Sequence, residues 1–187
     1  MTSEGARRAP RVSEREVVRT AAAFLEQGGY RVYPNLDAND YFDLVARRGN
    51  EVGLVEAKVS GSREVLVQAL KRRAWGNWVA VVLPSETAAR RLAARTEGTR
   101  AAPVGVWATS PEGGVRVIRA ARPWIRPGEE DPFAELRERF RVVLDRIDSG
   151  DLPANLRWDG VVGSVRRASG GRGFKEWRLD EPTGPDR

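Results

Sequence analysis

The chain contains no cysteine and no histidine among its 187 residues. Without cysteine, disulfides, thiolate zinc sites and cysteine nucleophiles are excluded, and the chain has no need of an oxidising compartment. Without histidine, serine–histidine triads, histidine metal ligands and histidine-dependent nuclease chemistry are excluded as well. Any catalysis must therefore use carboxylates, lysine, hydroxyl groups or a hard metal ion.

Long apolar runs are also missing from the sequence. No stretch of about 18 apolar residues occurs, and the arginines near the start are not followed by the apolar segment of a signal peptide. We therefore expect no membrane span and a cytoplasmic location. The net charge of +6 and the pI near 10.4 favour a polyanionic partner, with DNA as the leading candidate and RNA as an open alternative.

Hydrophobic periodicity predicts one main α/β domain over 13–125, preceded by a flexible arm over 1–12. Residues 131–187 are expected to form a C-terminal helix and a loosely ordered basic extension, with a hairpin near 169–171. The apolar stripe of this helix, from Phe133 to Ile147, suits packing on the core or on a second copy. Within the main domain we expect a helix over 13–28, strands over 30–36, 41–47 and 51–59, a helix over 62–74, a strand over 78–83, a helix over 85–96, and strands over 104–109 and 115–121.

The predicted strand over 51–59 is apolar on both faces except at Glu56 and Lys58. Side chains on a strand alternate between faces, so these two project from the same face about 7 Å apart. Asp43 lies in the preceding predicted strand, and a hairpin turn would bring its carboxylate close to that of Glu56. Two simpler interpretations stay open: Glu56 and Lys58 could form a surface ion pair, and Asp43 could be a turn residue, with Asp40 as the substitute ligand.

These residue types in this arrangement point to metal-dependent phosphodiester chemistry. Two carboxylates, from Asp43 and Glu56, and the backbone carbonyl of Ala57 suit Mg²⁺ or Mn²⁺, which prefer oxygen ligands. Such an ion would offset phosphate charge and activate water. Lys58 would orient that water or stabilise the charge that develops on the phosphate oxygens. Only three of the 32 basic residues are lysines, which singles out Lys58 further.

At these positions the chain resembles the PD-(D/E)XK nuclease superfamily. Segments 13–18, 42–46 and 55–59 are similar to the three motif blocks of archaeal Holliday junction resolvases. The resemblance implies a restriction-endonuclease-like α-β-β-β-α-β core with a mixed central sheet flanked by helices. It also implies that Asp43 and Glu56 hold the metal ion, that Lys58 assists the water, and that Glu14 reaches the metal site. Glu14 could instead be an acidic residue in the first helical turn that interacts favourably with the helix dipole.

Further positions carry weaker signals. Gln68 is similar to a glutamine of RecB-like branches, although a solvated or packing role is open. Glu16, three residues after Ser13, is expected to close a capping box rather than to bind metal. Beyond Lys58 the sequence looks more like uncharacterised bacterial branches, so junction specificity does not transfer. The run Lys71-Arg72-Arg73 with Trp75 is either a solvated helix face or a phosphate-contacting surface.

The sequence therefore predicts a Mg²⁺-dependent DNA endonuclease acting in repair, recombination or defence. The alternative is a catalytically silent module that keeps a nuclease fold to bind DNA or a partner. A homodimer is a further expectation, which rests on the resolvase resemblance and on the apolar stripe of the C-terminal helix.

Overall fold

The computed structural model describes residues 12–34, 41–110, 112–125, 128–153 and 157–168. None of the helices in these ranges is long and apolar enough to cross a membrane. The order of elements confirms the predicted α-β-β-β-α-β-α-β-β succession and the C-terminal helix after it, and adds one helix that was not expected. The elements are α1 (Glu14–Gln27), β1 (Arg31–Pro34), β2 (Leu44–Arg48), β3 (Glu51–Ala57), α2 (Arg63–Arg72), β4 (Trp78–Leu83), α3 (Glu86–Arg95), β5 (Gly105–Thr109), β6 (Val115–Arg119), α4 (Ala134–Asp148) and α5 (Trp158–Ala168).

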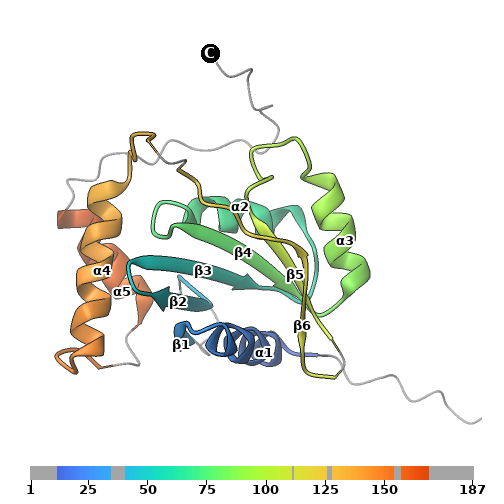
Figure 1. Ribbon diagram of the computed structural model, residues 1–187, viewed down its shortest axis with the longest axis horizontal. Coiled ribbons are helices and arrows are strands. Elements are labelled where there is room, and N and C mark those ends of the chain that lie inside the picture. Colours follow the sequence, from blue (N-terminus) through green and yellow to red (C-terminus); the bar gives the residue numbers. More distant parts are fainter. Residues whose placement is uncertain (1–11, 35–40, 111, 126–127, 154–156, 169–187) are drawn as a thin grey trace, which may run out of the picture.

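The strands of the described residues form one six-stranded mixed sheet in the order β1-β2-β3-β4-β5-β6 (Figure 1). Strands β1, β2 and β3 pair antiparallel, β3, β4 and β5 pair parallel, and β6 returns antiparallel to β5. The predicted α/β class, with a mixed sheet flanked by helices, is confirmed. Because β3, β4 and β5 run the same way, their carboxyl ends lie at one edge of the sheet.

Helix α1 covers one face of the sheet. Its buried residues Val17, Ala21 and Leu25 pack in a cluster with side chains of β2 to β5. The predicted capping box opens the helix: the backbone N–H of Ser13 donates to Glu16 Oε2 at 2.7 Å, and the Ser13 hydroxyl accepts from the Glu16 N–H at 3.3 Å. Glu16 is therefore the capping residue that we expected.

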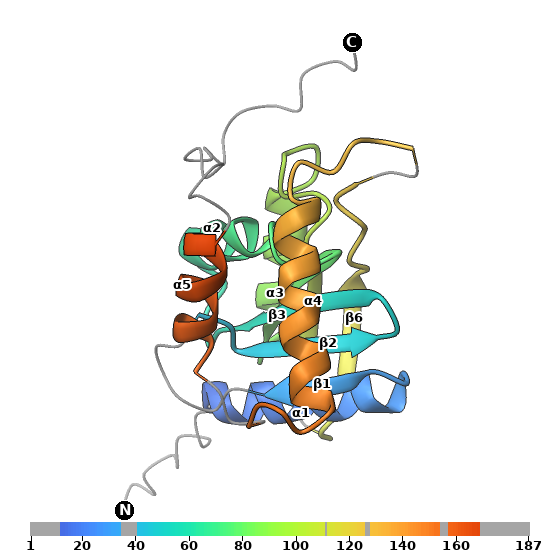
Figure 2. The same ribbon diagram turned by 90° about the vertical axis from the view of Figure 1, so that its left-hand side faces the viewer.

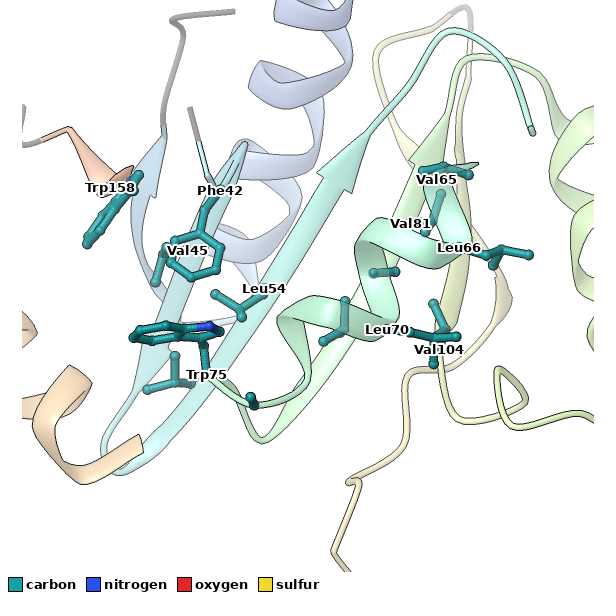
Figure 3. Packing of buried hydrophobic residues seen from close by; sticks show 14 of the residues in the cluster. Phe42, Val45, Leu54, Val65, Leu66, Leu70, Trp75, Val81, Val104 and Trp158 are labelled. Carbon is teal, nitrogen blue, oxygen red and sulfur yellow. The ribbon is translucent and has the colours of Figure 1, made fainter. Parts of the chain in front are cut away.

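Helices α2, α3, α4 and α5 contribute to the core on the opposite face of the sheet. This core includes an aromatic cluster of four rings, with centroids 5.5 to 6.0 Å apart for the pairs in contact. Figure 2 shows α4 running across the strands, and Figure 3 shows the rings of Phe42, Trp75 and Trp158 on one side of Leu54. The four rings belong to Phe42, Trp75, Phe140 and Trp158.

The apolar stripe of α4 is used inside the chain. Leu136, Phe140, Leu144 and Ile147 are all buried in the core that the sheet forms with the other helices. Of the two options that the sequence left open, packing on the core is the one observed. The surface on which the expected homodimer rested is therefore covered by the chain's own residues.

Helix α5 lies where a loosely ordered extension was expected, so that prediction was wrong for residues 158–168. Trp158, Val162 and Val165 recur at helical spacing and are buried. Gly160 and Gly163 lower the helix propensity of this segment, so the helical spacing of its apolar residues is a weak signal in the sequence. Packing of these apolar residues against the core stabilises the helix. Residues 1–11 of the expected arm over 1–12, and the hairpin near 169–171, lie outside the described residues.

The packing of α4 predicts a large loss of stability for Phe140→Ala. Phe140 is fully buried and contacts Phe42, Trp75 and Trp158, so its truncation should lower the free energy of unfolding by about 3–5 kcal/mol. Val142 on the same helix is 48% exposed, and Val142→Ala should change it by less than about 0.5 kcal/mol. Urea denaturation followed by circular dichroism measures both, and equal stabilities would contradict this packing.

Candidate functional site

The residues that the sequence singled out meet at the carboxyl end of β3. Glu56 and Ala57 are the last two residues of that strand, and Lys58 follows, its N–H donating to the carbonyl of Val82 in β4 at 3.1 Å. Strand β2 begins at residue 44, so Asp43 lies just before it and not inside a strand as predicted. The register, which pairs residue 44 with residue 55, continues to place Asp43 opposite Glu56.

Asp43 is tied to the end of β3 by a hydrogen bond. Its Oδ2 atom accepts from the backbone N–H of Ala57 at 2.8 Å, which fixes the carboxylate beside that strand. Burial raises the pKa of Asp43 above its usual range, while the Ala57 N–H and Lys58 act in the opposite direction. The carboxylate is therefore held in place by the backbone and partly shielded from water.

Lys58 lies between two carboxylates that come from different elements. Its Nζ atom is 3.5 Å from Glu14 Oε2, in the first turn of α1, and 3.9 Å from Asp43 Oδ2. The Lys58 side chain keeps 28% of its surface exposed, so it is partly open to solvent. The structure thus brings Glu14, Asp43 and Lys58 together.

Glu56 is buried, with 3% of its surface exposed, and pairs with an arginine. Its Oε1 atom accepts a hydrogen bond from Arg72 Nε at 2.6 Å. Burial raises the pKa of Glu56 to about 7; Arg72 acts against this rise, and the negative charge of Asp43 adds to it. The predicted projection of Glu56 and Lys58 from the same strand face is not observed: Glu56 pairs with Arg72 of α2, whereas Lys58 follows the end of β3 and pairs with Glu14 of α1. For the same reason the simple alternative, a surface ion pair between Glu56 and Lys58, does not form.

Arg72 is the site residue whose role sequence reasoning missed. Its guanidinium carbon lies 3.8 Å from the ring centroid of Tyr41, so an aromatic face covers the cation that pairs with Glu56. A signal was present in the sequence. Val65, Ala69 and Arg72 recur at i, i+4 and i+7 on the apolar stripe of α2, which puts an arginine on a buried helix face.

The predicted phosphate-contacting surface is only partly exposed. Trp75 is fully buried in the aromatic cluster and Arg72 is 8% exposed, so the prediction that these two side chains form a surface was wrong. Lys71 is exposed, and Arg73 is half-buried with its guanidinium 5.9 Å from the ring centroid of Trp124. A tryptophan beside a basic run was taken for a surface feature, whereas tertiary packing uses it as core.

Gln68 lies on α2 one turn before Arg72, which puts both side chains on the same helix face. Its Oε1 atom is buried and accepts no hydrogen bond from the residues that the structure describes. A buried acceptor without a donor costs free energy, so this oxygen suits a polar or cationic partner on that face.

The donor set at the end of β3 suits a hard divalent cation. The carboxylates of Asp43 and Glu56 and the carbonyl of Ala57 are oxygen ligands of the kind that Mg²⁺ and Mn²⁺ prefer. Within the described ranges no group of three or more acidic side chains is arranged to hold a metal ion. An ion here would therefore take its remaining ligands from water or substrate oxygens, as Mg²⁺ usually does. Asp40, the substitute ligand, lies outside those ranges.

A pocket of about 600 Å³ opens at the same edge of the sheet, beside the ends of β4 and β5. Its lining includes the hydroxyl groups of Thr109 and Ser110 and two side chains of opposite charge, Arg116 and Glu86. Ligands of open α/β sheets bind outside the carboxyl ends of parallel strands. The sheet edge that carries Asp43, Glu56 and Lys58 at the end of β3 therefore also carries a pocket beside the ends of β4 and β5.

The hydrogen bond from Ala57 to Asp43 predicts different stabilities for two substitutions. Asp43→Ala leaves the Ala57 N–H without its acceptor and should lower the free energy of unfolding by about 1–3 kcal/mol. Asp43→Asn keeps an oxygen acceptor and should cost less than about 1 kcal/mol. Thermal and urea unfolding of the metal-free protein at pH 7 measure both, and equal losses would show that this bond does not hold the loop.

Comparison of the chain with protein-family models, with curated proteins and with solved structures finds no match. The similarity to PD-(D/E)XK nucleases therefore stays a prediction that rests on the motifs, with the geometry of Asp43, Glu56 and Lys58 beside it.

Proposed function

We propose that this chain is a metal-dependent endonuclease that hydrolyses phosphodiester bonds in DNA. The observation that carries the proposal is the meeting of Asp43, Glu56 and Lys58 at the carboxyl end of β3. Carboxylates beside an ammonium group form one of the few catalytic sets open to a chain without cysteine or histidine. The net charge of +6 supports a polyanionic substrate.

Each residue would have its own role in this reaction. Asp43, Glu56 and the carbonyl of Ala57 would hold Mg²⁺ or Mn²⁺, which offsets phosphate charge and makes water a stronger nucleophile at neutral pH. The ammonium of Lys58 is placed to orient a water molecule or to contact the phosphate oxygens as negative charge develops on them. Glu14 holds that ammonium at 3.5 Å and limits its freedom to turn into solvent.

A second function is favoured by one feature of the site. Glu56 Oε1 is already engaged by Arg72, and the described residues supply no trio of acids for a metal ion. A chain with this arrangement could keep the fold as a catalytically silent module that binds DNA through its basic surface. Cleavage and binding assays on matched variants separate the two functions.

The first assay measures cleavage of linear, nicked, branched and single-stranded DNA, and of RNA, with Mg²⁺ or Mn²⁺. We expect the wild type to cut DNA, EDTA to abolish cutting, and Lys58→Ala and Asp43→Asn each to lower the single-turnover rate by about 10²–10³-fold. Arg139→Ala serves as the control, because its ion pair with Glu135 is exposed on α4 and includes none of the site residues. Equal rates for the wild type and Lys58→Ala would contradict the proposed mechanism.

The second assay measures DNA affinity as a function of salt concentration, by fluorescence anisotropy without metal. Lys71→Ala should weaken binding at every salt concentration and reduce the slope of log K against log salt by about one phosphate contact. The same affinity measurement on Lys58→Ala provides the comparison with Lys71→Ala. If no protein cuts but the wild type binds DNA with a steep salt dependence, the silent binding module is the correct function.

A further inference from the structure

We propose that the site loads one divalent ion and not two, because Arg72 supplies the fixed positive charge that a second ion would otherwise provide. The inference rests on the proposed function and adds the metal stoichiometry of the same site. It is carried by the contacts of Arg72 and by the balance of charges around Asp43 and Glu56.

Arg72 is held rigidly beside the candidate ligands. Its Nε donates to Glu56 Oε1 at 2.6 Å, and both side chains are almost fully buried, with 10% and 4% of their surfaces exposed. The ring of Tyr41 covers the guanidinium at 3.8 Å, and the ring of Phe42 lies at 5.7 Å. If this cation moved away, it would leave the buried carboxylate of Glu56 without a partner, which is costly.

Each of the two carboxylates has a cation beside it. Arg72 Nε lies 2.6 Å from Glu56 Oε1, and Lys58 Nζ lies 3.9 Å from Asp43 Oδ2. Two cations therefore flank a pair of acids. A divalent ion bound to the two carboxylates would therefore lie beside two positive charges that the protein itself supplies.

The charges of the site balance with one ion. The carboxylates of Glu14, Asp43 and Glu56 carry one negative charge more than Lys58 and Arg72 offset, once metal binding has deprotonated the ligands. One divalent ion turns this into a single excess positive charge, which one phosphodiester group neutralises. A second divalent ion would leave excess positive charge in a partly buried site, where charge is costly to hold.

The supply of oxygen ligands leads to the same stoichiometry. Sites with two metal ions place them about 3.5–4 Å apart and need carboxylates for both. In the described part of the chain no third acid joins the ligands in a metal-holding group, and one oxygen of Glu56 is occupied by Arg72. Arg72 thus supplies the positive charge that a second ion would supply, and it occupies the Glu56 oxygen that such an ion would need as a ligand.

The test is the stoichiometry of Mn²⁺ binding to the metal-free full chain, by isothermal titration calorimetry and by electron paramagnetic resonance. The wild type should bind one Mn²⁺ per chain without a spin-coupled pair, and Arg72→Lys, which keeps the charge, should do the same. Arg72→Gln removes the charge and frees a Glu56 oxygen, so it should bind two ions and show coupling. Circular dichroism at the assay temperature establishes that each variant is folded.

Each result decides between the possibilities. Two coupled ions in the wild type would overturn the inference and leave the proposed function standing, and this result needs no variant. A single ion in folded Arg72→Gln, bound as in the wild type, would show that Arg72 does not replace a second ion. If the wild type binds no Mn²⁺ and cuts no DNA, the proposed function fails, and the inference fails with it.

Discussion

The burial of the Glu56 carboxylate is the constraint on which the rest of the site depends. Strand β3 lies inside the sheet with helices on both faces, so an acid near its end loses its contact with water. A buried carboxylate needs a cation, and Arg72 provides it from α2. The ion pair ties the end of α2 to the end of β3, and Tyr41 packs over the arginine. Buried ion pairs are weak sources of stability, so their presence at a sheet edge favours a functional role.

The aromatic cluster extends this constraint to the C-terminal helices. Phe42 immediately precedes Asp43 and packs against Phe140 of α4 and Trp158 of α5. The carboxylate of Asp43 is therefore positioned from two directions: its own hydrogen bond to Ala57, and the anchored ring one residue before it. Helices that seemed separable from the main domain in the sequence contribute to the geometry of the site.

Local patterns predicted those features that local forces determine. The capping box at Ser13, the buried strand that carries Glu56 and the helical spacing of α2 and α4 could be predicted, because each depends on neighbours within a few residues. The interpretation failed where distant segments compete. Trp75 and the α5 segment have ambiguous local patterns, and only the core that they enter decides their burial.

Composition and short-range periodicity were enough to predict the order of elements, the chemistry open to a chain without cysteine and histidine, and the candidates Asp43, Glu56 and Lys58. The partner of each charged side chain, in contrast, became known from the folded protein alone. Arg72 reaches Glu56 across 16 positions of sequence, and Lys58 meets Glu14 across 44. Such pairs depend on how helices dock on the sheet, and no local pattern encodes the distance between two side chains on different elements.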